Sequence, residues 1–192
     1  EEHPERKFRF IFRQHMTGLG PISEAFSGFT GEFNTSFKYA IGHMYTMRRP
    51  LLFERSFRDQ VEEYRVPVFF NLRNDDMFVL RWGNPDYVRE YIQKMPHNLS
   101  PGFYMGSDGY VWGREFIAKN PEMAGRLEID KHWYRFRQWG QLAYNPLLGR
   151  DYWEATLKHR FPGIDAALLY EAWAATSEII PQLNTLSYKP ND

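Results

Sequence analysis

The chain has no cysteine among its 192 residues. Disulfide bonds, thiolate metal sites and thiol catalysis are therefore excluded. It also lacks an excess of either charge, because 24 basic side chains balance 24 acidic ones. Proteins that bind nucleic acids or anionic membrane surfaces usually carry a basic excess, so neither class of partner is indicated. No apolar run reaches the roughly 18 residues that a membrane helix needs.

Several motifs with known chemistry are missing as well. The chain contains no HExxH zinc motif, no phosphate-binding loop with a lysine and no GxSxG nucleophile elbow. Gly18-Leu19-Gly20 lacks the third glycine and the following helix of a dinucleotide-binding fingerprint. The sequence therefore indicates none of these enzyme classes.

Aromatic residues, in contrast, are plentiful. They make up 18% of the chain, with 16 phenylalanines, 12 tyrosines and 6 tryptophans. A chain of this length can form one domain with a real core, and most of the rings must pack there. The remainder can form a ligand-binding face.

Four short apolar runs predict β-strands at residues 9–12, 37–41, 66–72 and 103–105. Each run is followed by polar or charged residues, a pattern typical of a parallel sheet built from βα units. Helices are expected between the strands at residues 21–29, 53–64 and 87–95. Asn84 is expected to cap the last of these, with Pro85 in its first turn.

The chain after residue 120 is expected to be helical, with helices at residues 130–144, 151–160 and 164–180. We expect Asp151 to cap the second of these helices and Pro181 to end the third. The domains are then 1–120, four parallel βα units, and 121–192, a helical region packed on them. A complete (β/α)8 barrel needs about 250 residues, so we predict an α/β chain that forms the C-terminal half of a TIM-type barrel. The alternative is a small open sheet that is complete in itself.

Four carboxylates near the strand ends are candidate acid/base groups. Asp75 and Asp76 follow the third strand, and Asp108 and Glu115 follow the fourth. Groups just beyond the carboxyl ends of parallel strands line the functional face of such sheets. Glycoside hydrolysis uses two carboxylates of this kind. The alternative roles are turn and helix-cap contacts.

Cations, histidines and aromatic rings accompany these acids. Arg13, Lys38 and Arg73 suit an anionic sugar, or alternatively form ion pairs with nearby acids. His15 and His43 end neighbouring strands and are candidates for sugar hydroxyl groups or, alternatively, for a metal site. Four further rings are candidates for stacking on sugars, with a place in the core as the alternative: Trp82, Tyr104, Trp112 and Trp139.

Several stretches of the chain resemble the later part of the barrel in bacterial α-glucuronidase-like enzymes of glycoside hydrolase family 67 and its relatives. They are RFIFRQH at 9–15, SFKY at 36–39, HMY at 43–45, NLRNDD at 71–76, YVWG at 110–113 and WGQLAYNP at 139–146. The resemblance spans residues 7–180.

The resemblance implies a (β/α)8 barrel that hydrolyses a uronic-acid-bearing polysaccharide, such as decorated xylan, without a cofactor and with inversion. It implies that the base carboxylates come from later strands, here Asp75 or Asp76 with Asp108 or Glu115. The family's general acid comes from an earlier strand, and no residue of this chain matches it. Arg13, Lys38 and Arg73 then hold the anionic group, while His15, His43, Tyr104 and Trp112 contact hydroxyl groups and ring faces.

Two alternatives belong to other functional classes. One is a non-catalytic glycan-binding domain, and the other is a metal-dependent hydrolase that uses His15 and His43. The expected partners are the glycan substrate and a missing barrel half or second chain, without nucleic acid or membrane. We expect a periplasmic or extracellular location.

Overall fold

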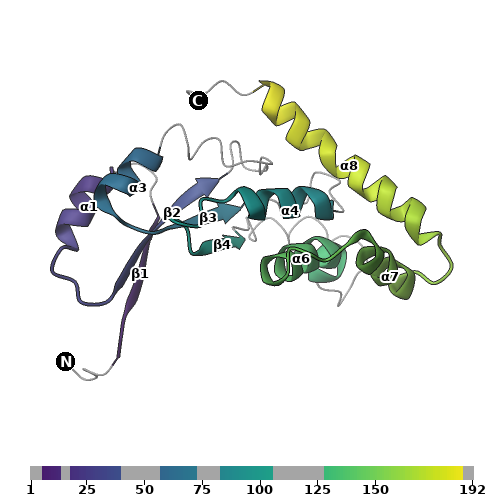
Figure 1. The fold of residues 1–192 in the computed structure, drawn as a ribbon, viewed down its shortest axis with the longest axis horizontal. Helices are drawn as coiled ribbons and strands as arrows, with labels where there is room; N and C mark the ends of the chain where they lie inside the picture. The colour runs from purple at the N-terminus through teal and green to yellow at the C-terminus, as the bar shows by residue number, and fades with distance from the viewer. Residues whose placement is uncertain (1–5, 14–17, 40–56, 73–82, 106–127, 188–192) are drawn as a thin grey trace, which may run out of the picture.

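The computed structural model describes residues 6–13, 18–39, 57–72, 83–105 and 128–187. These ranges contain four strands and six helices (Figure 1). In chain order they are β1 (Arg9–Arg13), α1 (Leu19–Ala25), β2 (Glu32–Tyr39), α3 (Arg58–Tyr64), β3 (Val68–Leu72), α4 (Pro85–Lys94), β4 (Gly102–Met105), α6 (Glu128–Tyr144), α7 (Arg150–Arg160) and α8 (Ala166–Ser187). None of these helices is both long and apolar enough to cross a membrane.

The four strands form one parallel sheet in the order β1-β2-β3-β4. Each strand therefore lies beside its neighbours in sequence, as expected for βα units whose chain winds in one direction. The prediction of an α/β chain with a parallel sheet is confirmed. Its closure into half of a (β/α)8 barrel stays a prediction.

One face of the sheet carries a row of phenylalanines that the helices cover. Phe37, Phe70 and Phe103 are register partners on β2, β3 and β4. Each ring contacts an aromatic ring that comes later in the chain: Phe37 stacks on Phe57 at the start of α3 with centroids 5.0 Å apart, Phe70 meets Tyr91 of α4 at 6.4 Å, and Phe103 meets Trp139 of α6 at 5.1 Å. These helices therefore pack on the same face.

The C-terminal helices join this core through α6, which lies next to α4 (Figure 1). Trp139 is only 1% exposed, and its ring centroid lies 5.5 Å from that of Tyr91. On the other side of α6, Tyr134 contacts Trp173 of α8 at 5.2 Å. The buried side chains thus form one continuous cluster from sheet to helices. The predicted domain boundary at residue 120 lies outside the described residues.

The second strand begins earlier than predicted. It starts at Glu32 rather than residue 37 and is described to Tyr39. The additional residues are mostly polar, and Asn34, Thr35 and Ser36 are nevertheless buried. Strand prediction from apolar runs misses such a segment because its polar side chains are hydrogen-bonded within the sheet: Thr35 donates to the Phe12 carbonyl of β1, and Ser36 bonds to Tyr104 of β4.

Several helix boundaries differ from the predictions. The helix expected at residues 21–29 is α1, which spans Leu19–Ala25. Gly149, not Asp151, is the N-cap of α7. Asp151 is exposed in the first turn, where its carboxylate interacts favourably with the helix dipole. The prediction that Pro181 ends the last helix is wrong, because α8 continues to Ser187. A proline inside a helix removes one backbone hydrogen bond and destabilises the helix by about 3 kcal/mol. A helix whose other turns are stabilised by packing can still continue beyond the proline.

Candidate functional site

The sheet face opposite the phenylalanine row is largely polar. Side chains alternate between the two faces of a strand, so the register partners of this face can be followed from strand to strand. Arg13 pairs with Ser36 and Ser36 with Phe69, while Lys38 pairs with Asn71 and Asn71 with Tyr104. The row of Lys38, Asn71 and Tyr104 lies toward the carboxyl ends of β2, β3 and β4, and Arg13 is the last residue of β1. Parallel βα sheets place their functional groups at these ends. Three predicted substrate-binding residues, Arg13, Lys38 and Tyr104, are therefore in these rows.

A hydrogen bond joins Ser36 and Tyr104 across β3. The two hydroxyl oxygens are 2.7 Å apart, and either group can donate. Ser36 is fully buried, whereas the Tyr104 side chain is partly exposed. A phenol held in this way keeps its ring in one orientation and leaves an oxygen lone pair or proton for a ligand.

Asn71 lies between Lys38 and Tyr104 and was not among the predicted site residues. It is only 3% exposed, and its Oδ1 has no hydrogen-bond partner in the part of the chain that the structure describes. Leaving a buried acceptor unpaired costs about 1–3 kcal/mol, so such groups usually have a function or a missing partner. The sequence signal was an asparagine inside an apolar strand, where this residue type is disfavoured.

The amino-terminal half of this face carries a charged network that has a structural role. Arg9 Nε donates to Glu32 Oε2 at 2.7 Å, and Asn34 Nδ2 donates to Glu32 Oε1 at 2.9 Å. The pKa of the Glu32 carboxyl group is lowered, most strongly by the hydrogen bond from Asn34 and next by the one from Arg9. Glu32 therefore stays ionised at neutral pH and is unsuited to act as a general acid. Arg13, at the other end of β1, is exposed and forms no ion pair with any described residue.

The other predicted site residues lie outside the described ranges. These are the acid/base candidates Asp75, Asp76, Asp108 and Glu115, and the substrate-binding candidates His15, His43, Arg73 and Trp112; Trp82 and the side chain of Lys38 are also outside. Their roles stay predictions. In sequence, each of the eight candidates follows the carboxyl end of a described strand.

Trp139, a candidate for stacking on sugars, lies in the core instead, which was the alternative role. It is buried between α4 and β4, in contact with Tyr91 and Phe103. Its spacing within a helical apolar stripe is equally compatible with core packing, which is what the structure shows.

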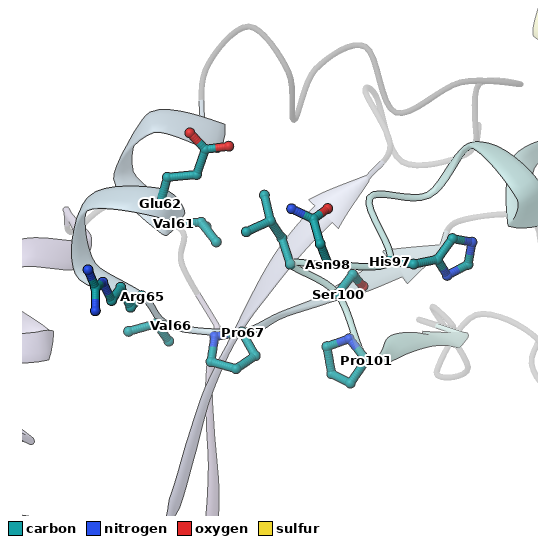
Figure 2. Close-up of a pocket in the computed structure, with 10 residues that line it drawn as sticks. Val61, Glu62, Arg65, Val66, Pro67, His97, Asn98, Ser100 and Pro101 are labelled. Carbon is teal, nitrogen blue, oxygen red and sulfur yellow. The ribbon is translucent and has the colours of Figure 1, made fainter.

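A pocket of about 510 Å³ lies at the amino ends of the strands, opposite the carboxyl ends described above. Pro67 and Pro101, which directly precede β3 and β4, are among its lining residues, together with Glu62, Arg65 and His97. Figure 2 shows that the charged groups of Glu62 and Arg65 and the His97 ring are spread around the pocket rather than directed toward one another. The pocket therefore lacks a convergent set of acid/base groups, and its place at the amino ends is not where βα sheets carry catalysis.

No group of three or more metal-ligating side chains occurs among the described residues. The two histidines of the metal alternative, His15 and His43, lie outside those residues. That alternative therefore stays a prediction.

Comparison with known proteins shows a shared fold. No protein-family model matches the chain, and no curated protein matches it. Among solved structures, it is similar to a GH138 enzyme targeting pectin rhamnogalacturonan II, with a TM-score of 0.71 and 18% sequence identity. The alignment covers 94% of this chain and 22% of that chain. The present chain thus spans about a fifth of the enzyme it resembles, and the resemblance to family 67 stays a prediction.

Proposed function

We propose that this chain contributes to a glycoside hydrolase that acts on an acidic, uronic-acid-bearing polysaccharide or oligosaccharide. The observation that carries the proposal is the fold likeness over 94% of the chain to part of an enzyme described as targeting a pectin polysaccharide. Pectins are acidic glycans, so that substrate belongs to the class that Arg13, Lys38 and Arg73 suggest. A polymeric glycan substrate is compatible with a periplasmic or extracellular location.

The roles that we propose for the site residues are those that the sequence suggests. Asp75 or Asp76 with Asp108 or Glu115 would move protons at the scissile bond. Arg13, Lys38 and Arg73 would hold the carboxylate of the sugar. Hydroxyl groups and ring faces would contact His15, His43, Tyr104 and Trp112. To these we add Asn71, whose buried Oδ1 has no partner among the described residues and can accept a hydrogen bond from a sugar hydroxyl group.

The chain would supply half of a (β/α)8 barrel. The sequential strand order and the helices on one face support this proposal, and the polar face would then point inward. β1 and β4 are the edge strands of the described sheet, so the other half, or a second chain, would pair with them. Hydrogen exchange tests this: outward-facing amides of β1 should exchange rapidly in the isolated chain, and slow exchange there would contradict an open edge.

The activity is tested by titrating the purified chain with aldouronic oligosaccharides, oligogalacturonides and neutral xylo-oligosaccharides while product release is followed. We expect binding of the acidic ligands only. Turnover should be lost in Asp75→Asn or Asp76→Asn, and in Asp108→Asn or Glu115→Gln, with binding retained. Asp59→Asn, an exposed acid in the first turn of α3, is the matched control and should leave both unchanged.

Each other outcome has a distinct meaning. Cleavage of aldouronic substrates in preference to oligogalacturonides would support the finer α-glucuronidase-like assignment. Acidic ligands that bind without turnover, before and after the substitutions, would point to a half-site that needs the other barrel half or to a glycan-binding domain. Activity that is lost in a chelator and restored by zinc would favour the metal route through His15 and His43. The absence of both binding and turnover would contradict the proposal for this chain.

A further inference from the structure

A groove of about 380 Å³ lies between α6 and α7. Small-molecule sites typically have volumes of about 300–1,000 Å³. The groove is lined by Trp133 and Arg137, one turn apart on α6, and by Tyr152, Thr156, His159 and Arg160 on one face of α7. In Figure 1 both helices lie on the side of the molecule away from β1. All the described lining residues belong to α6 and α7, and none to the strands, so the groove is distinct from the polar face of the sheet.

Two arginines of the groove are held by aromatic rings. Arg137 Nη2 donates to the Tyr152 hydroxyl group at 3.0 Å, and its Cζ lies 5.9 Å from the centroid of the same ring. Arg160 Cζ lies 5.5 Å from the centroid of Trp133. Stacking on a ring restricts a guanidinium group without using its in-plane donors. Most of the N–H groups of both arginines thus remain for a ligand.

The charge of the groove is not balanced by acidic residues. Among the described residues, no aspartate or glutamate lines it, and neither Arg137 nor Arg160 forms an ion pair. Arg150, also on α7, provides the contrast, because it pairs with Glu154 and with Glu171. Cations in the last turn of α7 complement the helix dipole, which accounts for His159 and Arg160. It does not account for Arg137, which lies two turns before the end of α6.

We propose that this groove binds a carboxylate-bearing sugar residue of the same acidic glycan. The Arg137 and Arg160 guanidinium groups match a carboxylate by charge-assisted hydrogen bonds, and His159 adds a further polar contact. Trp133 and Tyr152 supply an apolar wall for the C–H groups of a sugar ring. This proposal rests on the proposed function, since it takes its ligand class from it. The groove would hold a residue of the polymer distant from the bond that is cleaved.

NMR titration of the purified chain with oligogalacturonides tests the groove locally. We expect shifts of the Trp133 indole N–H and the His159 ring, and affinity about tenfold weaker in Arg137→Gln and in Arg160→Gln, since each removes a charged donor. Arg150→Gln is the matched control, because it removes an arginine of α7 that lies outside the groove, and should change the affinity by less than about twofold. Circular dichroism verifies that each variant is folded.

The remaining outcomes separate the groove from the catalytic proposal. Unchanged turnover of a short acidic substrate in Arg137→Gln, with loss of the Trp133 and His159 shifts, supports a second site. The same shifts without any turnover support the groove and contradict only catalysis by the isolated chain. The groove proposal is overturned when acidic oligosaccharides leave Trp133 and His159 unshifted, or when Arg137→Gln and Arg160→Gln bind as tightly as Arg150→Gln. Equal binding of inorganic phosphate or of a neutral oligosaccharide would also overturn it.

Discussion

The hydroxyl group of Tyr104 is the one hydrogen-bond partner that the described structure gives to the Ser36 side chain. Because Ser36 is fully buried, the Tyr104→Phe variant should leave its hydroxyl group unpaired. We expect a decrease of about 1–2 kcal/mol in the free energy of unfolding, measured by urea denaturation. Tyr144→Phe removes a hydroxyl group from a side chain that is 91% exposed and is the control. An equal effect of the two substitutions would contradict a structural role for the Ser36–Tyr104 bond.

Gly83 is a second residue whose identity the structure requires. Its φ angle is +131°, and a Cβ atom there would lie 2.5 Å from Oε1 and 2.8 Å from Nε2 of Gln138. Gly83→Ala should therefore lower the free energy of unfolding by more than about 2 kcal/mol, through backbone strain and a clash with a buried amide.

Gly140→Ala is the matched comparison in the same denaturation experiment. Gly140 is an exposed residue of α6 with no atom within 4 Å of a Cβ position. Alanine should therefore raise the stability there by about 0.5–1 kcal/mol. Changes of the same sign at both glycines would contradict the distinction between them.

At the same scale, single residues were predicted unevenly from the sequence. Tyr104 was a predicted site residue because an aromatic ring near the end of a strand is visible locally. Ser36 was missed because its partner Tyr104 comes near only when β2, β3 and β4 pair. Asn71 was missed because only the same pairing places it between Lys38 and Tyr104. For Trp139 the sequence allowed two roles, stacking on a sugar or packing in the core, and only the packing of α6 on α4 distinguishes between them.

The N-cap of α4 makes a prediction at the scale of an element. Asn84 Oδ1 accepts hydrogen bonds from the backbone N–H groups of Asp86 at 3.0 Å and Tyr87 at 3.2 Å. Its Nδ2 also donates to Glu178 of α8 at 2.6 Å. Asn84→Ala should therefore cost about 1–2 kcal/mol of unfolding free energy, the upper part of the range for an N-cap.

Two further substitutions separate the cap from the contact with α8. Asn84→Ser keeps a capping oxygen and loses the donor, so it should cost less than Asn84→Ala in urea denaturation. Asn84→Asp also keeps the cap but places a second carboxylate next to Glu178, and its stability should improve as the pH falls and one carboxyl group takes up a proton. Equal stability of the alanine and serine variants would contradict the capping role.

Element boundaries were predictable where the signal is local. The Asn84-Pro85 pair predicted the start of α4 because capping and the fixed φ angle of proline act within one turn. The same reasoning failed at Pro181, where α8 continues to Ser187. Local signals take no account of tertiary contacts in the preceding turns, such as the hydrogen bonds of Ser177 and Glu178 to Gly83 and Asn84. β2 was predicted too short for a related reason: its polar first half is stabilised by β1 and by the Arg9–Glu32–Asn34 network.

For the whole molecule, the repeated order of apolar run and polar strand end was sufficient to predict a parallel α/β sheet. The relation of the helical region to that sheet was not predictable, because it depends on aromatic contacts between distant segments. Trp139 of α6 lies against Tyr87 and Tyr91 of α4 and against Phe103 of β4, with ring centroids 6.5, 5.5 and 5.1 Å away. Sheet and helices therefore share one core, and we expect them to unfold together.

Trp139→Ala tests this coupling. Removing a fully buried tryptophan should cost about 3–5 kcal/mol, and the loss of its contacts with α4 and β4 should separate the unfolding of the sheet from that of α6, α7 and α8. Urea denaturation followed by far-ultraviolet circular dichroism and by hydrogen exchange of individual amides should give one midpoint for the wild-type chain and two for the variant. Leu147→Ala, at a side chain that is 84% exposed, is the control and should shift the midpoint little. A single shared midpoint in Trp139→Ala would show instead that the remaining contacts between α4 and α6 are enough to hold the two parts as one cooperative unit.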